Sequence, residues 1–190
     1  MFCKNWGARI AVWPNFYDCT YGERTGRTPG WRFSYNPVII SPTPTQNPQR
    51  FVGTLPTGQD GRGFLAVEVT RGFLERKKPP YCVVNFHTNY KKATPTIASY
   101  EPIFAQLVEQ HKQVIVCADF NAGTSSTINK IDGTNVKLQQ FMEDLGFVKA
   151  YHSGIDGIWV SNPVNITDAK VETETYGKSD HAAISAVIEL

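Results

Sequence analysis

The sequence predicts an α/β domain in which layers of β-sheet are covered by helices. Predicted strands outnumber predicted helices, and helices separate some of the strands along the chain. The chain has 190 residues, of which 41% are hydrophobic and 12% aromatic. That length and composition suffice for a single domain over residues 1–190 with its own hydrophobic core.

Composition and charge exclude several classes of protein. No apolar run approaches the roughly 18 residues of a membrane-spanning helix, so we expect no membrane partner. Lys4, Asn5 and Arg9 interrupt the region where a secretory signal needs unbroken apolar residues, and we expect a cytoplasmic protein. The net charge of +2 is too small to indicate nucleic-acid binding by itself.

The cysteines are typical of free thiols. No two of the four cysteines have the C-x-x-C spacing of a redox or zinc motif. Cys82 and Cys117 lie inside apolar runs, where a reduced thiol packs as a small hydrophobic group. This pattern favours a reducing compartment over a disulfide framework.

Short apolar runs predict the strands of the first two thirds of the chain. Residues 14–36 read as a long aromatic-rich loop, and residues 41–62 hold too many prolines for a helix or a central strand. A polar turn over residues 71–80 joins two of the runs. The predicted strands are residues 8–13, 38–40, 64–69, 81–87 and 113–118.

Two amphipathic patterns predict helices. The first covers residues 95–112, with Thr94 as its N-cap and Pro95 in its first turn. The second covers residues 133–145, with Gly146 after its last turn. The remaining strands are predicted at residues 158–160, 164–175 and 182–190.

Polar side chains cluster where the apolar strands begin or end. Each has an ordinary structural explanation: His87 alone is more often a structural histidine, and Asp119 with Asn121 could open a turn. Asp156 alone could form an Asx-turn, and the pair of residues 180–181 could cap the last strand. Four such groups at successive strand ends favour a shared functional site, because loops at strand ends display reactive groups on a rigid scaffold.

The same residues carry a family resemblance. Residues 116–121, Val-Cys-Ala-Asp-Phe-Asn, resemble the G-D-F-N motif of the endonuclease/exonuclease/phosphatase superfamily. Residues 83–87 resemble the strand that bears the family's histidine, and residues 155–159 resemble its R-I-D-Y-I-W segment. Residues 178–181 match its S-D-H segment, and residues 61–63 match its arginine-bearing strand. Order and spacing agree from about residue 61 to residue 190.

The resemblance implies a particular fold, a two-sheet β-sandwich flanked by helices. One sheet is expected to contain the strands at residues 64–69, 81–87 and 113–118. The second sheet is expected to contain the strands near residues 158–160, 164–175 and 182–189.

The resemblance also implies hydrolysis of a phosphodiester with a divalent metal ion. Asp119 would orient or deprotonate water, and Asn121 would donate a hydrogen bond to a phosphoryl oxygen. His181 would contact the phosphate and be polarised by Asp156, whose negative charge favours the protonated imidazole. His87 would act near the leaving oxygen as an acid or as a charge stabiliser.

Further residues are implied as ligands of metal and phosphate. Asp180, together with Asp119, would provide hard oxygen ligands to Mg²⁺ or Mn²⁺. Arg62 would contact phosphate through its bidentate guanidinium, and Asn85 and Lys91 would complete the phosphate-binding group.

One departure from the family pattern leaves three explanations open. The family's first strand, with its Asn, and the Glu that is its main metal ligand have no counterpart before residue 8. The chain is then a fragment, a short form completed by a second chain, or a binding module without catalysis. Because the other polar residues are all present, we favour catalysis, with nucleic acid as the substrate. An inactive binding or regulatory protein and an enzyme for a small or lipid phosphate are the alternatives.

Overall fold

The computed structural model describes residues 18–21, 38–41, 45–55, 58–71, 77–163, 165–172 and 181–190. Among these, the backbone alone is described for residues 18–21, 38–41, 50–55 and 58–63. The strand predicted at residues 8–13 lies outside the described residues. Of the residues implied as ligands, Asp180 lies outside them too, and only the backbone of Arg62 is described.

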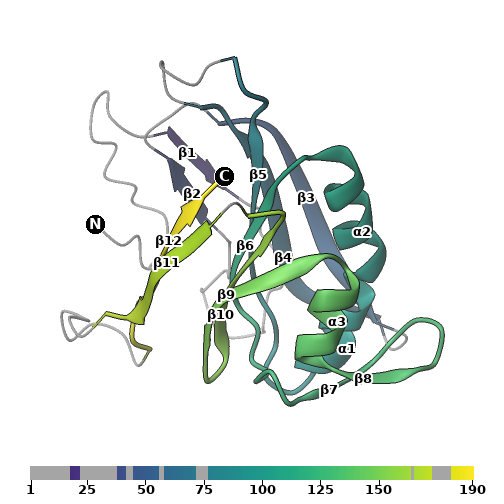
Figure 1. Ribbon diagram of the computed structural model, residues 1–190. Coiled ribbons are helices and arrows are strands. Elements are labelled where there is room, and N and C mark those ends of the chain that lie inside the picture. Colours follow the sequence, from purple (N-terminus) through teal and green to yellow (C-terminus); the bar gives the residue numbers. More distant parts are fainter. Residues whose placement is uncertain are drawn as a thin grey trace.

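A six-stranded mixed sheet forms the centre of the fold (Figure 1). Its spatial order is β3-β4-β5-β6-β10-β9, in which β5 and β6 run parallel and the other neighbours run antiparallel. The prediction that residues 64–69, 81–87 and 113–118 share one sheet is confirmed. The strands are β3 (Thr45–Leu55), β4 (Gly58–Val69), β5 (Tyr81–His87), β6 (Val114–Asp119), β9 (Phe147–Ser153) and β10 (Asp156–Ser161).

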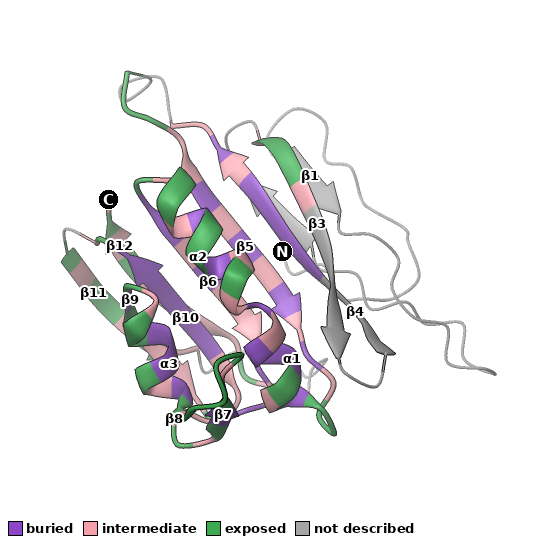
Figure 2. Ribbon diagram, turned by 90° about the vertical axis from the view of Figure 1, so that its right-hand side faces the viewer, coloured by how far each residue is buried: buried purple, intermediate pink, exposed green. Residues whose placement is uncertain are grey.

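Three helices cover one face of this sheet, and the main hydrophobic core lies beneath them (Figures 1 and 2). The helices are α1 (Ala93–Ser99), α2 (Glu101–Gln110) and α3 (Leu138–Asp144). Phe64 and Phe86 from the sheet pack against Tyr100 and Phe104, with ring centroids 5.0–6.0 Å apart. Each such ring removes enough apolar area from water to contribute about 1.5–3 kcal/mol, so this face of the sheet is held rigidly.

Two small antiparallel sheets lie on the opposite face, as Figure 1 shows. One pairs β1 (Asp18–Tyr21) with β2 (Val38–Ser41), and the other pairs β11 (Asn165–Val171) with β12 (Ile184–Glu189). The strand predicted at residues 38–40 is therefore confirmed. Sheet layers flanked by helices also confirm the predicted fold class.

One of the strands predicted for the second sheet belongs to the central sheet. Residues 158–160 do not join the strands near residues 164–175 and 182–189; they belong to β10, which pairs with β6 in the central sheet. Residues 157–161 are all buried, so this strand is covered on both faces, as is typical of a strand inside a central sheet.

The segment predicted as one helix over residues 95–112 is two helices that meet at Tyr100. Pro102 has no N–H to donate to the carbonyl of residue 98, so a continuous helix is interrupted there. Thr94 is not the N-cap as predicted: α1 starts at Ala93, after Lys92, and no side chain caps it.

The second predicted helix is shorter than residues 133–145. Its first turn is replaced by a hairpin of β7 (Thr127–Asn129) and β8 (Asn135–Lys137). Asp132 accepts hydrogen bonds from the amide and hydroxyl of Thr134, and Gly133 supplies the positive φ of +86° that the turn needs. Gly146, with φ of +85°, follows α3 as predicted. The next strand, β9, was not predicted.

The proline-rich segment forms no helix within the described residues. It contributes β3, an edge strand that was not predicted, and residues 58–62 of β4. Because β3 is at the edge, Pro48 does not interrupt a central ladder. Cys82 and Cys117 are free thiols, and burial raises their pKa values to about 12 and about 11. None of the helices in the described part of the chain is long and apolar enough to cross a membrane.

Candidate active site at the ends of three central strands

Three neighbouring strands of the central sheet each carry a polar residue at the same end of the sheet, and these residues form a row. His87 at the end of β5 is the register partner of Asp119 at the end of β6, and Asp119 is also the partner of Asp156 at the start of β10. Register partners point to the same face of a sheet. Ala118, the neighbour of Asp119 in β6, packs against the core under the helices. The three polar side chains therefore point to the opposite face, where β11 and β12 lie.

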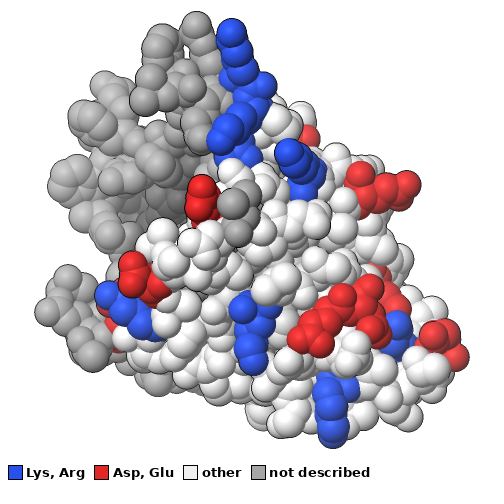
Figure 3. Space-filling model, in the orientation of Figure 1, with Lys and Arg blue, Asp and Glu red and all other residues white. Residues whose placement is uncertain are grey.

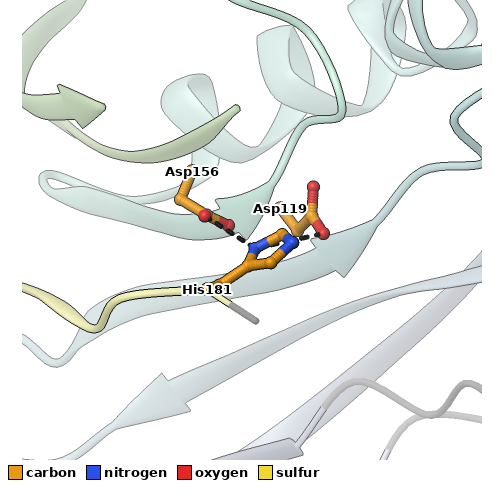
Figure 4. Close-up of side chains that lie close together, drawn as sticks. All are labelled: Asp119, Asp156 and His181. Carbon is orange, nitrogen blue, oxygen red and sulfur yellow. Dashed lines mark hydrogen bonds and ion pairs between the residues drawn. The ribbon is translucent and has the colours of Figure 1, made fainter. Parts of the chain in front are cut away.

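His181 joins this row from the segment that leads into β12 (Figure 4). Its Nδ1 lies 2.8 Å from Oδ2 of Asp156 and 4.0 Å from Oδ2 of Asp119. On the other side, Nε2 of His87 lies 3.2 Å from Oδ2 of Asp119. The structure thus brings together four residues predicted from separate motifs, as two imidazole–carboxylate pairs side by side.

The four side chains are partly buried rather than enclosed. The exposed fractions are 17% for Asp119 and 23% for Asp156, against 33% for His87 and 36% for His181. The carboxylates are therefore shielded from solvent, whereas both imidazoles can still meet a substrate.

Electrostatics at Asp119 reflect this shielding. Burial raises the pKa of the Asp119 carboxyl above its usual range, and the neighbouring His87 imidazole is the largest influence that lowers this pKa again. The hydrogen bond from the Asn121 amide N–H and the charge interaction with His181 also lower the pKa of Asp119, while the negative charge of Asp156 raises it. An ionised Asp119 consequently depends on positive charge nearby, which a protonated histidine or a bound cation supplies.

The tautomer of His181 follows from its partner. An ionised carboxylate only accepts hydrogen bonds, so Nδ1 of His181 carries the proton that it donates to Asp156. In the neutral ring Nε2 is then the acceptor nitrogen, and in the charged ring both nitrogens donate. Asp156 stabilises the charged ring, which suits contact with a developing oxyanion.

Asn121 is held in a strained turn directly after β6. Its φ of +48° lies in the left-handed region, which asparagine tolerates better than most residues. Its backbone N–H donates to Oδ1 of Asp119 at 2.9 Å, and its side-chain Nδ2 donates to the carbonyl of Thr88 at 2.7 Å. This second bond fixes which end of the amide is the donor.

Thr88, which sequence reasoning missed, fastens this turn to the end of β5. It is fully buried, its N–H donates to the Asp119 carbonyl at 3.1 Å, and its hydroxyl donates to the Phe120 carbonyl. No sequence signal could identify it, because a threonine after a strand is common.

His152 was also missed. It lies in β9 opposite Gly157 of β10, and its ring packs at a tilt against Phe120, with the ring centroids 5.2 Å apart. Its ring nitrogens contact the Ala122 carbonyl at 3.0 Å and the indole N–H of Trp159 at 3.1 Å. Burial lowers the pKa of His152, so the ring favours its neutral form.

Gly157 leaves room for this histidine, and Gly157→Ala is expected to lower the free energy of unfolding by about 1–3 kcal/mol through overpacking. A Cβ at residue 157 would lie 2.6 Å from Nδ1 of His152 and 3.0 Å from atoms of Phe120 and Trp159. Urea denaturation measures the loss. In a His152→Ala background the same glycine substitution should cost less, and an equal cost in both backgrounds would contradict the packing described here.

Of the remaining predicted residues, the structure describes the side chains of Asn85 and Lys91. Asn85 is two residues before His87 in β5 and so points to the same face of the sheet. Lys91 is exposed in the loop after β5, with its ammonium 5.5 Å from the centre of the Tyr90 ring. The side chains of Arg62 and Asp180 lie outside the described part of the structure.

A pocket of about 300 Å³ lies beside the Asp156–His181 pair. Its walls combine these two polar residues with small and aliphatic groups. It is lined by Ser153, Gly154, Ile155, Asp156, Val171, His181, Ala182 and Ile184.

The donor set of the row fits a divalent cation. One ligand atom each from Asp119, Asp156 and His181 lie within 4.8 Å of one another. Carboxylate oxygens are the ligands that Mg²⁺ and Mn²⁺ prefer, and Mn²⁺ also accepts imidazole. Since Nδ1 of His181 already donates to Asp156, the two carboxylates are the better ligands of the set.

Comparison with known proteins gives a match in structure and none in sequence. No family model matches the chain, and no curated protein matches it. The catalytic domain of human Nocturnin with bound sulfate is similar at a TM-score of 0.68 and 14% identity, over 90% of this chain and 72% of that one.

Two bacterial structures extend this result. An endonuclease/exonuclease/phosphatase protein from Beutenbergia cavernae has a TM-score of 0.67 and 13% identity, over 90% of this chain and 53% of its own. The 3'-5' exonuclease NExo from Neisseria meningitidis has a TM-score of 0.62 and 17% identity, over 92% and 80%. The chain therefore spans about half of the Beutenbergia protein and more of the other two. These likenesses show that the chain has the fold of the endonuclease/exonuclease/phosphatase superfamily.

Proposed function

We propose that this chain is a divalent-metal-dependent phosphodiester hydrolase that acts on nucleic acid. The observation that carries the proposal is the row His87, Asp119, Asp156 and His181, in which each carboxylate lies within 3.2 Å of an imidazole. Phosphodiester hydrolysis needs an activated water, stabilisation of charge on the phosphoryl oxygens and help for the leaving oxygen. This row contains groups for each task on one face of the sheet.

In the proposed mechanism Asp119 orients the attacking water and accepts its proton, a role that its raised pKa supports. His181, held by Asp156, donates a hydrogen bond to a phosphoryl oxygen on which negative charge develops. The Asn121 amide, already anchored to Thr88, donates its second N–H to the phosphate.

On the other side of Asp119, His87 contacts the leaving oxygen as an acid or a charge stabiliser. Arg62, Asn85 and Lys91 are proposed to bind the flanking phosphates. Asp119 and Asp180 are the proposed ligands of Mg²⁺ or Mn²⁺. Among the described residues, Asp156 offers a further carboxylate oxygen close to Asp119. When bound, this cation neutralises charge on the phosphoryl oxygens.

Nucleic acid is favoured as the substrate by the character of the similar structures. NExo is a 3'-5' exonuclease. A second NExo structure, with a product DNA hairpin bound, is similar to this chain at a TM-score of 0.58 and 16% identity. On the face drawn in Figure 3, the described residues place both basic and acidic side chains at the surface. The choice of nucleic acid over another phosphate ester therefore rests on these similar structures, and the proposed hydrolysis rests on the site.

A substrate panel tests the proposal. Purified protein is incubated with single-stranded DNA, plasmid DNA, RNA, a 2',3'-cyclic nucleotide and an inositol polyphosphate, each with Mg²⁺ and with Mn²⁺. We expect cleavage of at least one nucleic acid with Mg²⁺ or Mn²⁺, because carboxylate oxygens are suitable ligands for both cations. Hydrolysis of the inositol or cyclic phosphate alone would replace nucleic acid with a small phosphate ester. No hydrolysis of any substrate would favour a binding module on the same fold.

A further inference from the structure

We propose that His152 is a positioning residue for the candidate site: its neutral ring, protonated on Nε2, holds the turn that presents Asp119 and Asn121. The inference rests on the proposed function, because the turn carries the group assigned to water activation. His152 itself does not face the row. It is the register partner of Gly157, whose neighbour Asp156 points to the opposite face of the sheet.

The hydrogen bonds of His152 define one protonation state. The indole N–H of Trp159 can only donate, so Nδ1 of His152 is an acceptor at 3.1 Å. The Ala122 carbonyl can only accept, so Nε2 carries the proton and donates at 3.0 Å. A charged ring would place an N–H against the indole N–H, and the ring is therefore neutral in this arrangement.

These bonds connect the turn to a fully buried part of the core. Trp159 is fully buried, and Phe120, also fully buried, packs against the His152 ring. Because Gly157 has no Cβ, the imidazole of His152 occupies the space beside it. His152 is thus fixed by its surroundings, and through Ala122 it fixes the backbone three residues after Asp119.

The turn is held from both sides. Thr88 at the end of β5 bonds to the carbonyls of Asp119 and Phe120 and to the Asn121 side chain. On the β9–β10 side, the Phe120 amide donates to the Ile155 carbonyl at 2.8 Å, and His152 binds the Ala122 carbonyl. Because Asn121 has a positive φ, the turn depends on such restraints to keep its conformation.

Two substitutions separate the two bonds of the ring. In His152→Gln the amide N–H₂ lies near the place of imidazole Nε2, so the donor to Ala122 is kept and the acceptor for Trp159 is lost. In His152→Asn the side-chain oxygen lies near the place of Nδ1, so the acceptor for Trp159 is kept and the donor to Ala122 is lost. Each variant loses one buried hydrogen bond, and we expect similar decreases in the urea midpoint.

Their activities should differ. His152→Asn is expected to lower kcat by about 10–100-fold with little change in KM, since a small displacement of catalytic groups has effects of this size. His152→Gln should stay within about threefold of the wild-type kcat, because the bond to the turn is preserved. Ser161→Ala is the matched control. It removes a buried acceptor from the Val114 N–H on the same strand as Gly157, without touching the turn, and should leave kcat unchanged.

Hydrogen exchange gives a readout that needs no activity. The Phe120 amide, bonded to the Ile155 carbonyl, reports whether the turn opens locally. We expect protection at this amide to fall about tenfold in His152→Asn and to persist in His152→Gln. Equal protection and equal kcat in the two variants would overturn the inference. If the wild type hydrolyses none of the substrates but the two variants still show the expected difference in hydrogen exchange, the proposed function is overturned and the positioning role is supported.

Discussion

Replacing Asp119 by asparagine is expected to lower kcat by about 10²–10⁴-fold, the range that a general base or electrostatic group supplies. Asparagine still accepts the Asn121 N–H through Oδ1, so the turn after β6 should be retained. It cannot accept a proton from water, and it removes the negative charge that lies 3.2 Å from His87. Steady-state kinetics on the preferred substrate of the panel measures the loss.

The same substitution should raise stability at neutral pH. Burial raises the folded-state pKa of Asp119 above the unfolded value of 3.8, so the folded state holds its proton more tightly. Between these two pKa values the folded state binds more protons, and stability falls as the pH rises through that window. Asparagine does not ionise, so the variant does not lose stability as the pH rises through this window. Urea titrations should therefore show a stability advantage for Asp119→Asn at pH 7 that shrinks toward pH 3.8. A variant less stable than the wild type at pH 7 would contradict the assigned burial cost.

His181→Ala is the second substitution with a large expected effect, again a loss of about 10²–10⁴-fold in kcat. The ring is 36% exposed and precedes β12, whose own residues hold that strand in place. The free energy of unfolding should therefore change little, which thermal or urea denaturation can verify.

Asp156→Asn is the graded control for His181. The amide oxygen can still accept the Nδ1–H of His181, so the ring orientation is kept, but the charged ring loses its ionic partner. We expect a smaller loss of kcat than in His181→Ala. Equal activity of the wild type and His181→Ala would remove His181 from the proposed mechanism.

Much of the central sheet could be predicted because its strands are continuous apolar runs. Residues 81–87 and 113–118 gave β5 and β6 nearly to the residue, and the polar side chains at their ends marked the row. What the sequence could not provide was the register. Only the structure shows that Asp119 is opposite both His87 and Asp156, because parallel and antiparallel pairings of buried strands are equally compatible with their hydrophobicity.

The errors have local physical causes. The hairpin of β7 and β8 was mistaken for the first turn of a helix, although Asp132-Gly133 is a turn signal that could have identified it. The position of β10 in the central sheet was missed because a short apolar run does not indicate its neighbours. His152 was missed because its role depends on Gly157 and Trp159, which reach it only through the β9–β10 pairing.

The most direct test is cleavage of an end-labelled nucleic acid by the wild type, Asp119→Asn and His181→Ala in parallel, each with Mn²⁺ and with excess EDTA. We expect the wild type to cleave with Mn²⁺, EDTA to stop the cleavage and renewed Mn²⁺ to restore it. Both variants should be at least about 100-fold slower. Cleavage by the wild type that persists in EDTA, or equal rates for the wild type and the two variants, would contradict a metal-dependent phosphodiesterase at this row of side chains.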